Sequence, residues 1–163
     1  MAKAGSSIAR VREDAERLGL RTEIQTMDSS TRTAEDAARA CGCAVAQIVK
    51  SLIFEDARTG GLVLLLVSGS HNADTAYIDA AYGLSLTRCD ARRVRDETGF
   101  AIGGVSPIGL LSPVPTYMDR TILDFPVVWC AAGRPDSIFS VAPDILRDAV
   151  EAIMIDVQPS PEA

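Results

Sequence analysis

Lys50 stands out because lysine is rare in this chain and because of where it lies. The sequence holds sixteen basic residues, of which only Lys3 and Lys50 are lysines. Lys50 falls inside residues 48–54, IVKSLIF, whose apolar and β-branched content predicts a buried strand. Burying an ammonium group is costly unless an anionic group meets it. Two interpretations remain: the amine reaches out past the sheet edge, or it faces a cleft that needs a positive charge.

A glycine-rich segment is the second feature that could carry chemistry. Residues 98–109, TGFAIGGVSPIG, contain four glycines and one proline, so they cannot form a regular helix, and they are too apolar for a floppy linker. Glycine lets backbone N–H groups approach a ligand closely. A loop of this kind can point amides at an anion or at an oxyanion that develops during a reaction. The alternative is a tight loop that binds nothing.

Few side chains could act as an acid, a base or a nucleophile. Asp119 ends a predicted strand and is the best carboxylate candidate, although it could equally be a turn residue before Arg120. His71 is the only imidazole, and its neighbours SGSHN predict an exposed turn, which disfavours a Ser-His-Asp hydrolase. The spacing and the prolines of the glycine-rich segment fit neither a nucleophile elbow nor a dinucleotide fingerprint. An enzyme built on this chain would use Lys50, backbone amides, a carboxylate and water.

The cysteines and the net charge argue against several classes of protein. The four cysteines form no C-x-x-C pair and have no histidine nearby, so we predict neither a metal site nor a cofactor and interpret them as buried thiols: Cys41, Cys43, Cys89 and Cys130. A net charge of −6 disfavours a protein that coats DNA or long stretches of RNA. It allows one that touches only the end of a nucleic acid. The arginines of residues 88–95 could serve such a contact or form a solvated helix face.

Length and composition indicate one globular domain. The chain has 163 residues, of which 47% are apolar. No apolar run approaches the ~20 residues of a membrane span, and the first residues lack the apolar stretch of a signal peptide, so we expect a cytoplasmic protein that binds no membrane. We place the domain over residues 1–157 and interpret residues 158–163 as a disordered tail.

The hydrophobic pattern predicts helices and strands in an irregular order. Helices are predicted at 7–18, 34–41, 75–82, 91–98 and 143–154, and strands at 21–27, 48–54, 62–68, 84–87, 114–119, 127–131 and 137–141. Thr33 is a good N-cap for the second helix, and this capping role explains the residue without a ligand. A contact of Thr33 with a ligand would be a second role. Strands that outnumber the long helices and are unevenly spaced indicate an α/β domain with a mixed, curved sheet.

Residues 48–54, 98–109 and 117–119, in that order, resemble the YbaK/EbsC family. These proteins are the free-standing relatives of the editing (INS) domain of bacterial prolyl-tRNA synthetase. Residues 33–38, TAEDAA, also match a segment common in the family, and the resemblance covers roughly residues 7–155. It implies a barrel-like sheet surrounded by helices. It also implies hydrolysis of the ester that links a wrong amino acid to tRNA, after the synthetase has released it.

The resemblance assigns expected roles residue by residue. The family's editing lysine falls on Lys50, and its Gly-x-x-x-Pro loop falls on residues 103–107, in which Gly103 and Gly104 are expected to supply amide donors. The acidic position after the next strand falls on Asp119, which is expected to hold the substrate's ammonium group or to support the loop. The other expected substrate contacts are Thr33, Ser51, Ser106 and Pro107.

Two departures leave the substrate open. Some members that remove alanine carry Asn after the lysine, where this chain has Ser51, and the residues around Ser106 are closer to members that act on cysteinyl-tRNA. The candidates are Cys, Ala, Ser, Thr and 2-aminobutyrate on tRNA, attacked by water or by the thiol of a cysteinyl substrate. The expected partner is the acceptor end of misacylated tRNA, with a synthetase as a further candidate. The alternatives are a non-catalytic module that binds tRNA ends, nucleotides or a synthetase, and a purely structural domain.

Overall fold

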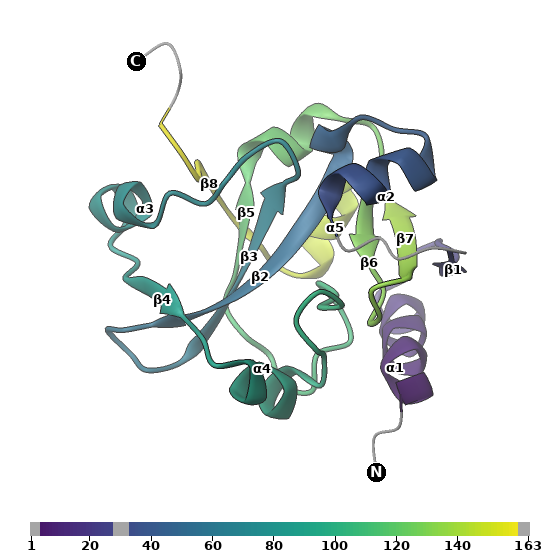
Figure 1. Cartoon of the computed structure of the whole chain (residues 1–163), viewed down its shortest axis with the longest axis horizontal. Coiled ribbons are helices and arrows are strands. Elements are labelled where there is room, and N and C mark those ends of the chain that lie inside the picture. Colours follow the sequence, from purple (N-terminus) through teal and green to yellow (C-terminus); the bar gives the residue numbers. More distant parts are fainter. Residues whose placement is uncertain (1–3, 28–32, 160–163) are drawn as a thin grey trace.

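The computed structural model describes residues 4–27 and 33–159, which form one α/β domain (Figure 1). Its helices are α1 (Ala4–Arg17), α2 (Ala34–Cys41), α3 (Thr75–Tyr82), α4 (Ala91–Thr98) and α5 (Pro143–Ala149), with 3₁₀ turns η1 (Val45–Gln47) and η2 (Arg120–Asp124). Its strands are β1 (Gln25–Thr26), β2 (Ile48–Asp56), β3 (Leu62–Ser68), β4 (Leu86–Arg88), β5 (Thr116–Asp119), β6 (Val128–Ala131), β7 (Ser137–Val141) and β8 (Ile153–Ile155).

The strands form one mixed sheet. Their order is β1-β7-β6-β2-β3-β5-β8, with β4 paired to β2 off this path. β2 and β3 are antiparallel, whereas β6 runs parallel to β2 and β5 runs parallel to β3. Figure 1 shows the long strands β2 and β3 crossing the centre of the molecule, with the helices arranged around the sheet. The predicted α/β domain with a mixed sheet surrounded by helices is confirmed.

β3 is the centre of the core. All seven of its residues are buried, as expected for a strand that is covered on both faces. Leu64 and Leu66 face a large cluster that includes Phe100, Met118 and Phe139. The alternate side chains face a second cluster on the other side of the sheet: Val63, Leu65 and Val67, packed with Ile78 and Ile155.

β2 has an interruption in its pairing that matters for the site. Its pairing with β3 is continuous from Val49 to Glu55. On its other side, β6 pairs only with Ile48 and Val49, and β4 pairs only from Phe54 onward. Residues 50–53 therefore have a strand neighbour on one side only. We call this stretch the β2 gap.

Capping residues explain why α2 begins and ends where it does. The Thr33 hydroxyl accepts a hydrogen bond from the Asp36 N–H at 3.0 Å, which confirms the predicted N-cap. Gly42 follows the helix with φ +66°, a conformation that glycine adopts without strain. These two ends fix α2 on β2, beside the β2 gap.

The largest error of the sequence prediction lies at the C-terminal end. The helix expected at 143–154 ends at Ala149, and residues 153–155 form β8, which pairs in parallel with β5. The three-residue strand is too short to show a period of its own, and its pairing partner lies more than thirty residues earlier. Several strands are also shorter than expected, above all 21–27, where only Gln25–Thr26 pairs.

Two further expectations concern regions that the structure covers in part. The Asn72 N–H donates to Oε1 of Gln158 at 3.2 Å, while residues 160–163 lie outside the described residues, so the disordered tail and the boundary at residue 157 stay predictions. Lys3 also lies outside them. Among the described residues no helix has the length and apolar character needed to cross a membrane.

Candidate functional site

A pocket of about 120 Å³ opens at the β2 gap. The start of α2, the strands β2, β6 and β7 and the glycine-rich segment contribute its walls. Four residues singled out from the sequence line it: Thr33, Lys50, Ser51 and Gly103. The other four do not: Gly104, Ser106, Pro107 and Asp119. Lys50 and the glycine-rich segment, which are far apart in the sequence, therefore meet in one hollow.

The pocket takes side chains from both faces of the sheet. Neighbouring residues of a strand point to opposite faces, so Lys50 shares a face with Ile48 and with its β6 partner Trp129. Ser51 shares the other face with Val49 and its β6 partner Cys130. The first group faces α2 and includes Ala34 and Ala37, which we call the α2 side. The second group lies with Val105 of the glycine-rich segment, and we call it the loop side.

Lys50 is half-buried and has one hydrogen-bond partner among the described residues. Its Nζ donates to the carbonyl oxygen of His71. Burial lowers the pKa of Lys50 from its usual value, and the negative charges of Glu35 and Asp119 oppose this shift. Lys50 forms no salt bridge with a carboxylate in the described part of the chain. Its ammonium group therefore has donors left for a ligand in the pocket.

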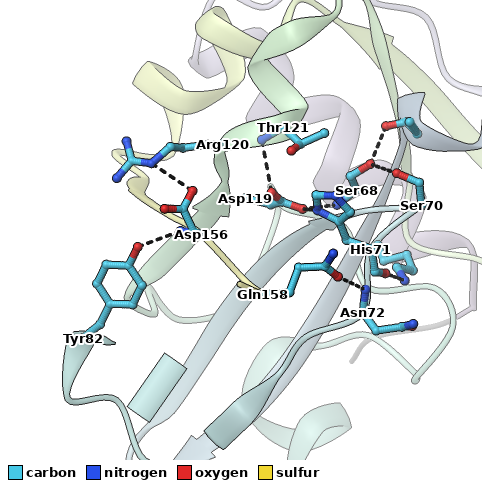
Figure 2. A network of polar contacts seen from close by, with 12 residues as sticks. Ser68, Ser70, His71, Asn72, Tyr82, Asp119, Arg120, Thr121, Asp156 and Gln158 are labelled. Atoms are coloured by element: carbon cyan, nitrogen blue, oxygen red, sulfur yellow. Dashed lines mark hydrogen bonds and ion pairs between the residues drawn. The ribbon is translucent and has the colours of Figure 1, made fainter. Parts of the chain in front are cut away.

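The structure places Asp119 deep inside the protein rather than at the pocket. Its side chain is only 2% exposed. Oδ2 accepts hydrogen bonds from the Ser68 N–H at 3.1 Å and from Nδ1 of His71 at 2.9 Å, and Oδ1 accepts one from the Thr121 N–H at 3.1 Å (Figure 2). Three donors already occupy this carboxylate. These bonds anchor the turn that contains Ser68 and His71 and not the glycine-rich loop, so both roles expected of Asp119 stay predictions.

His71 corrects an expectation from the sequence. It was predicted to lie in an exposed turn, but its side chain is only 24% exposed and lies against Asp119 (Figure 2). An ionised carboxylate can only accept, so Nδ1 of His71 carries the proton. The partner is 48 residues away in sequence, and nothing near His71 signals it. Asp119 thus holds the His71 side chain, and the His71 carbonyl holds Lys50.

The glycine-rich segment supplies different amides from those expected. The Gly104 N–H donates to the Ala101 carbonyl at 3.0 Å, so it is engaged within a turn and is not open to a ligand. Gly103 takes φ +93°, which the third position of a type II turn requires. The amides of Gly103 and Val105 have no hydrogen-bond partner among the described residues, and both residues line the pocket. Val105 was missed because a valine in a loop carries no chemical signal.

Ser106, Pro107 and Gly104 have structural roles instead of the pocket contacts expected of them. The buried Ser106 hydroxyl accepts from the Ile108 N–H at 3.2 Å and so shapes the segment from within. Pro107 is buried beside it. A Cβ on Gly104 would lie 3.0–3.2 Å from backbone atoms of Arg134, so glycine permits the close approach of these two loops.

Helix α1 clamps the glycine-rich segment, which the sequence did not reveal. Arg10 donates to the carbonyl oxygens of Gly99 at 2.7 Å and of Gly109 at 3.1 Å, and it lies over the Phe100 ring at 5.1 Å. The Gly109 N–H donates to Oδ2 of Asp14 at 2.8 Å. Both ends of the segment are thereby tied to one helix, which holds the amides of the pocket in place.

The remaining polar candidates serve the scaffold. Within the predicted arginine cluster, Arg93 binds the carboxylates of Glu55 and Glu97 and the Gly60 carbonyl, while its arginine neighbours are exposed. Burial raises the pKa of the Cys41 thiol to about 11 and also raises that of Cys130. These thiols stay protonated near neutral pH and are poor nucleophiles.

No group of three or more His, Cys, Asp or Glu that could hold a metal occurs among the described residues.

Comparison with known proteins agrees with this arrangement. Residues 28–149 match the family described as "Aminoacyl-tRNA editing domain". The chain is 27% identical over 136 residues to the uncharacterized protein YwhH of Bacillus subtilis, covering 83% of this chain and 86% of YwhH. It is 25% identical over 115 residues to EbsC of Enterococcus faecalis, named as a candidate Cys-tRNA(Pro)/Cys-tRNA(Cys) deacylase, covering 70% of each. A crystal structure described as a candidate trans-editing enzyme for prolyl-tRNA synthetase superposes with a TM-score of 0.87 at 38% identity, covering 94% of this chain and 98% of that one.

Proposed function

Since the chain belongs to the aminoacyl-tRNA editing domain family, we propose that it hydrolyses the ester between a wrongly attached small amino acid and the 3′ end of tRNA. The observation that carries this proposal is the pocket at the β2 gap, in which Lys50, Ser51 and the free amides of Gly103 and Val105 meet. An aminoacyl ester is already activated. The protein therefore needs only to orient it, stabilise the oxyanion and admit a nucleophile.

The groups in the pocket suit the steps of ester hydrolysis. Water attacks the carbonyl carbon, and the resulting oxyanion accepts hydrogen bonds from the Gly103 and Val105 amides. The ester C–O bond then breaks, and the proton lost by the attacking water passes to the departing ribose oxygen, which gives the free amino acid and the ribose hydroxyl. In a cysteinyl substrate the side-chain thiol could replace water as the nucleophile; the thiol proton then passes to the departing ribose oxygen, and cysteine leaves as a cyclic thioester. Lys50 neutralises the terminal phosphate of the acceptor end with its remaining donors. The oxyanion and the phosphate are thus met by different groups.

The α-ammonium of the substrate also finds a partner at the β2 gap. The Gly69 N–H donates to the Ile48 carbonyl, so the backbone groups of Ile48 face β3. Because the direction of the backbone groups alternates along a strand, those of Ser51 face away from β3. No strand pairs with Ser51 on that side. Its carbonyl oxygen is an acceptor for an ammonium group.

The size of the pocket supports a small substrate group. Its volume of about 120 Å³ is well below the roughly 300–1,000 Å³ of pockets that enclose a whole drug-sized ligand. It can hold an aminoacyl group while the nucleotide lies outside. With a net charge of −6, contact with only the tRNA end also fits the electrostatics better than a long RNA interface.

A panel of deacylation assays tests the proposal. Alanyl-, cysteinyl-, seryl-, threonyl- and 2-aminobutyryl-tRNA are incubated with the protein at enzyme excess, and the remaining ester is measured against time. We expect hydrolysis of at least one of them well above the rate without protein. A protein that binds these tRNAs but hydrolyses none of them would be a binding module, and the proposal would be abandoned.

Gly103→Ala is expected to lose most deacylase activity at a modest cost in stability. A Cβ at Gly103 would meet no atom within 4 Å, so the effect comes from its φ of +93°, which strains any other residue. The strain should cost about 1–2 kcal/mol of unfolding free energy or turn the peptide and its amide away from the pocket. Chemical denaturation and deacylation kinetics measure the two effects.

Gly60→Ala is the matched control for Gly103→Ala. Gly60 has φ +77° and also has no atom within 4 Å of an added Cβ, but it lies in the hairpin between β2 and β3, away from the pocket. It should lose similar stability and keep full activity. Equal losses of activity in both variants would mean that the Gly103 amide has no special role.

A further inference from the structure

The Ser51 hydroxyl is a buried polar group without a partner. Among the described residues it is the sole buried side-chain nitrogen or oxygen that has no hydrogen bond. Buried hydroxyl groups are nearly always paired, because leaving one unpaired costs free energy that an alanine would not. Ser51 also lines the pocket. An atom of this kind is explained if a ligand completes its hydrogen bond.

The surroundings of Ser51 limit what that ligand group can be. On the loop side of the pocket, Ser51 lies with the apolar side chains of Val49 and Val105 and with Cys130, a buried thiol that bonds only weakly. Lys50 lies on the other face of the sheet, together with α2. Ser51 therefore provides the one strong hydrogen-bonding side chain of the loop side. A small group that is apolar except for one hydroxyl or thiol fits there.

The position of the ester decides which part of the substrate enters the loop side. If the α-ammonium binds the Ser51 carbonyl and the oxyanion binds the amides of Gly103 and Val105, the carbon that bears the side chain sits at the β2 gap. The phosphate points toward Lys50 on the α2 side. The amino-acid side chain is then directed into the loop side, toward the hydroxyl of the same Ser51.

We infer that Ser51 determines specificity, and that the preferred substrates carry a hydroxyl or thiol on the side chain: serine, threonine or cysteine rather than alanine or 2-aminobutyrate. This inference rests on the proposed deacylase function and narrows its substrate class. The Ser51 hydroxyl exchanges a hydrogen bond with the substrate hydroxyl or thiol. A substrate with a methyl group at that place leaves the hydroxyl unpaired, and a site built around a polar contact discriminates against such an analogue.

Seryl- and 2-aminobutyryl-tRNA make the sharpest test, because their side chains differ only by a hydroxyl in place of a methyl group. For the wild-type protein we expect kcat/KM to favour the seryl substrate by about tenfold or more, the effect of one net hydrogen bond. Ser51→Ala should bring that ratio to within about threefold of unity, mainly by slowing the seryl substrate. Ser85→Ala, a loop serine outside the pocket, should leave the ratio unchanged.

The outcomes separate this inference from the proposed function. If the wild-type protein hydrolyses 2-aminobutyryl- or alanyl-tRNA as fast as seryl-tRNA, or if Ser51→Ala leaves the ratio unaltered, Ser51 does not select the side chain, although the deacylase function stands. If no substrate is hydrolysed, both ideas fall. Thermal unfolding shows whether Ser51→Ala is folded. If it is not folded, the ratio of kcat/KM for seryl- and 2-aminobutyryl-tRNA in the wild-type protein alone tests the inference.

Discussion

Replacing Lys50 with methionine is expected to lower kcat/KM for a misacylated tRNA by a factor of about 10²–10³, the usual effect of removing one preorganised electrostatic contact. Methionine keeps most of the volume of the side chain but loses its charge. Because burial already disfavours the charged form of Lys50 and lowers its pKa, the variant should unfold at the same temperature as the wild-type protein or slightly higher. Deacylation kinetics and thermal unfolding measure both expectations.

The form of this loss identifies the role of the amine. If Lys50 binds the terminal phosphate, Lys50→Met should mainly raise KM and weaken the dependence of KM on salt. If it polarises the ester carbonyl, kcat should fall while KM stays unchanged. Lys50→Arg, which keeps the charge, should recover part of the phosphate contact. A variant without the amine that turns over normally would remove Lys50 from the mechanism.

Asp119→Asn is expected to have the largest effect on stability. The Asp119 carboxylate accepts from three donors in a buried site. An asparagine would turn an NH₂ group toward at least one of them and would lose the negative charge. We expect the unfolding free energy to fall by about 2–4 kcal/mol. Activity should fall as well at temperatures where the variant is folded, because the His71 carbonyl that holds Lys50 would lose its anchor.

Asp156→Asn is the matched control, since it makes the same chemical change nearby. Its salt bridge to Arg120 is 3.2 Å long and half exposed, so its loss should cost at most about 1 kcal/mol. His71→Ala separates the two effects of Asp119, because it removes the imidazole that Asp119 holds, while the backbone carbonyl that accepts from Lys50 and the bonds of Asp119 to Ser68 and Thr121 stay in place. Full activity in a folded His71→Ala variant would contradict the positioning role.

The sequence predicts best what a local pattern encodes. Thr33 and Gly42 mark the ends of α2, and the unbroken run of apolar residues in β3 is typical of a strand that is buried on both faces. Lys50 could be singled out because an ammonium in an apolar strand needs a reason. The glycines of the 98–109 segment pointed to backbone amides, although of the two glycine amides proposed only that of Gly103 lacks a hydrogen-bond partner among the described residues.

The sequence could not predict contacts between segments that are far apart in the chain. From the sequence, the turn around His71 is predicted to be exposed, but in the structure Asp119 lies beside it. Arg10 is predicted to be a surface residue of a helix, but it donates to the carbonyl oxygens of Gly99 and Gly109. Residues 153–155 form a strand only because the edge of β5 is there to pair with them. In each case a tertiary partner decides the structure, and local propensity does not report it.

The β2 gap has a consequence for the solubility of the protein. Unpaired backbone in the middle of a sheet is a template onto which a strand from another molecule can add. Gly103 and Val105 of the glycine-rich segment line the pocket at this gap, and Arg10 and Asp14 hold the two ends of the segment. Variants that break this clamp should therefore form oligomers as well as lose the proposed deacylase activity, so that the same contacts serve both activity and solubility.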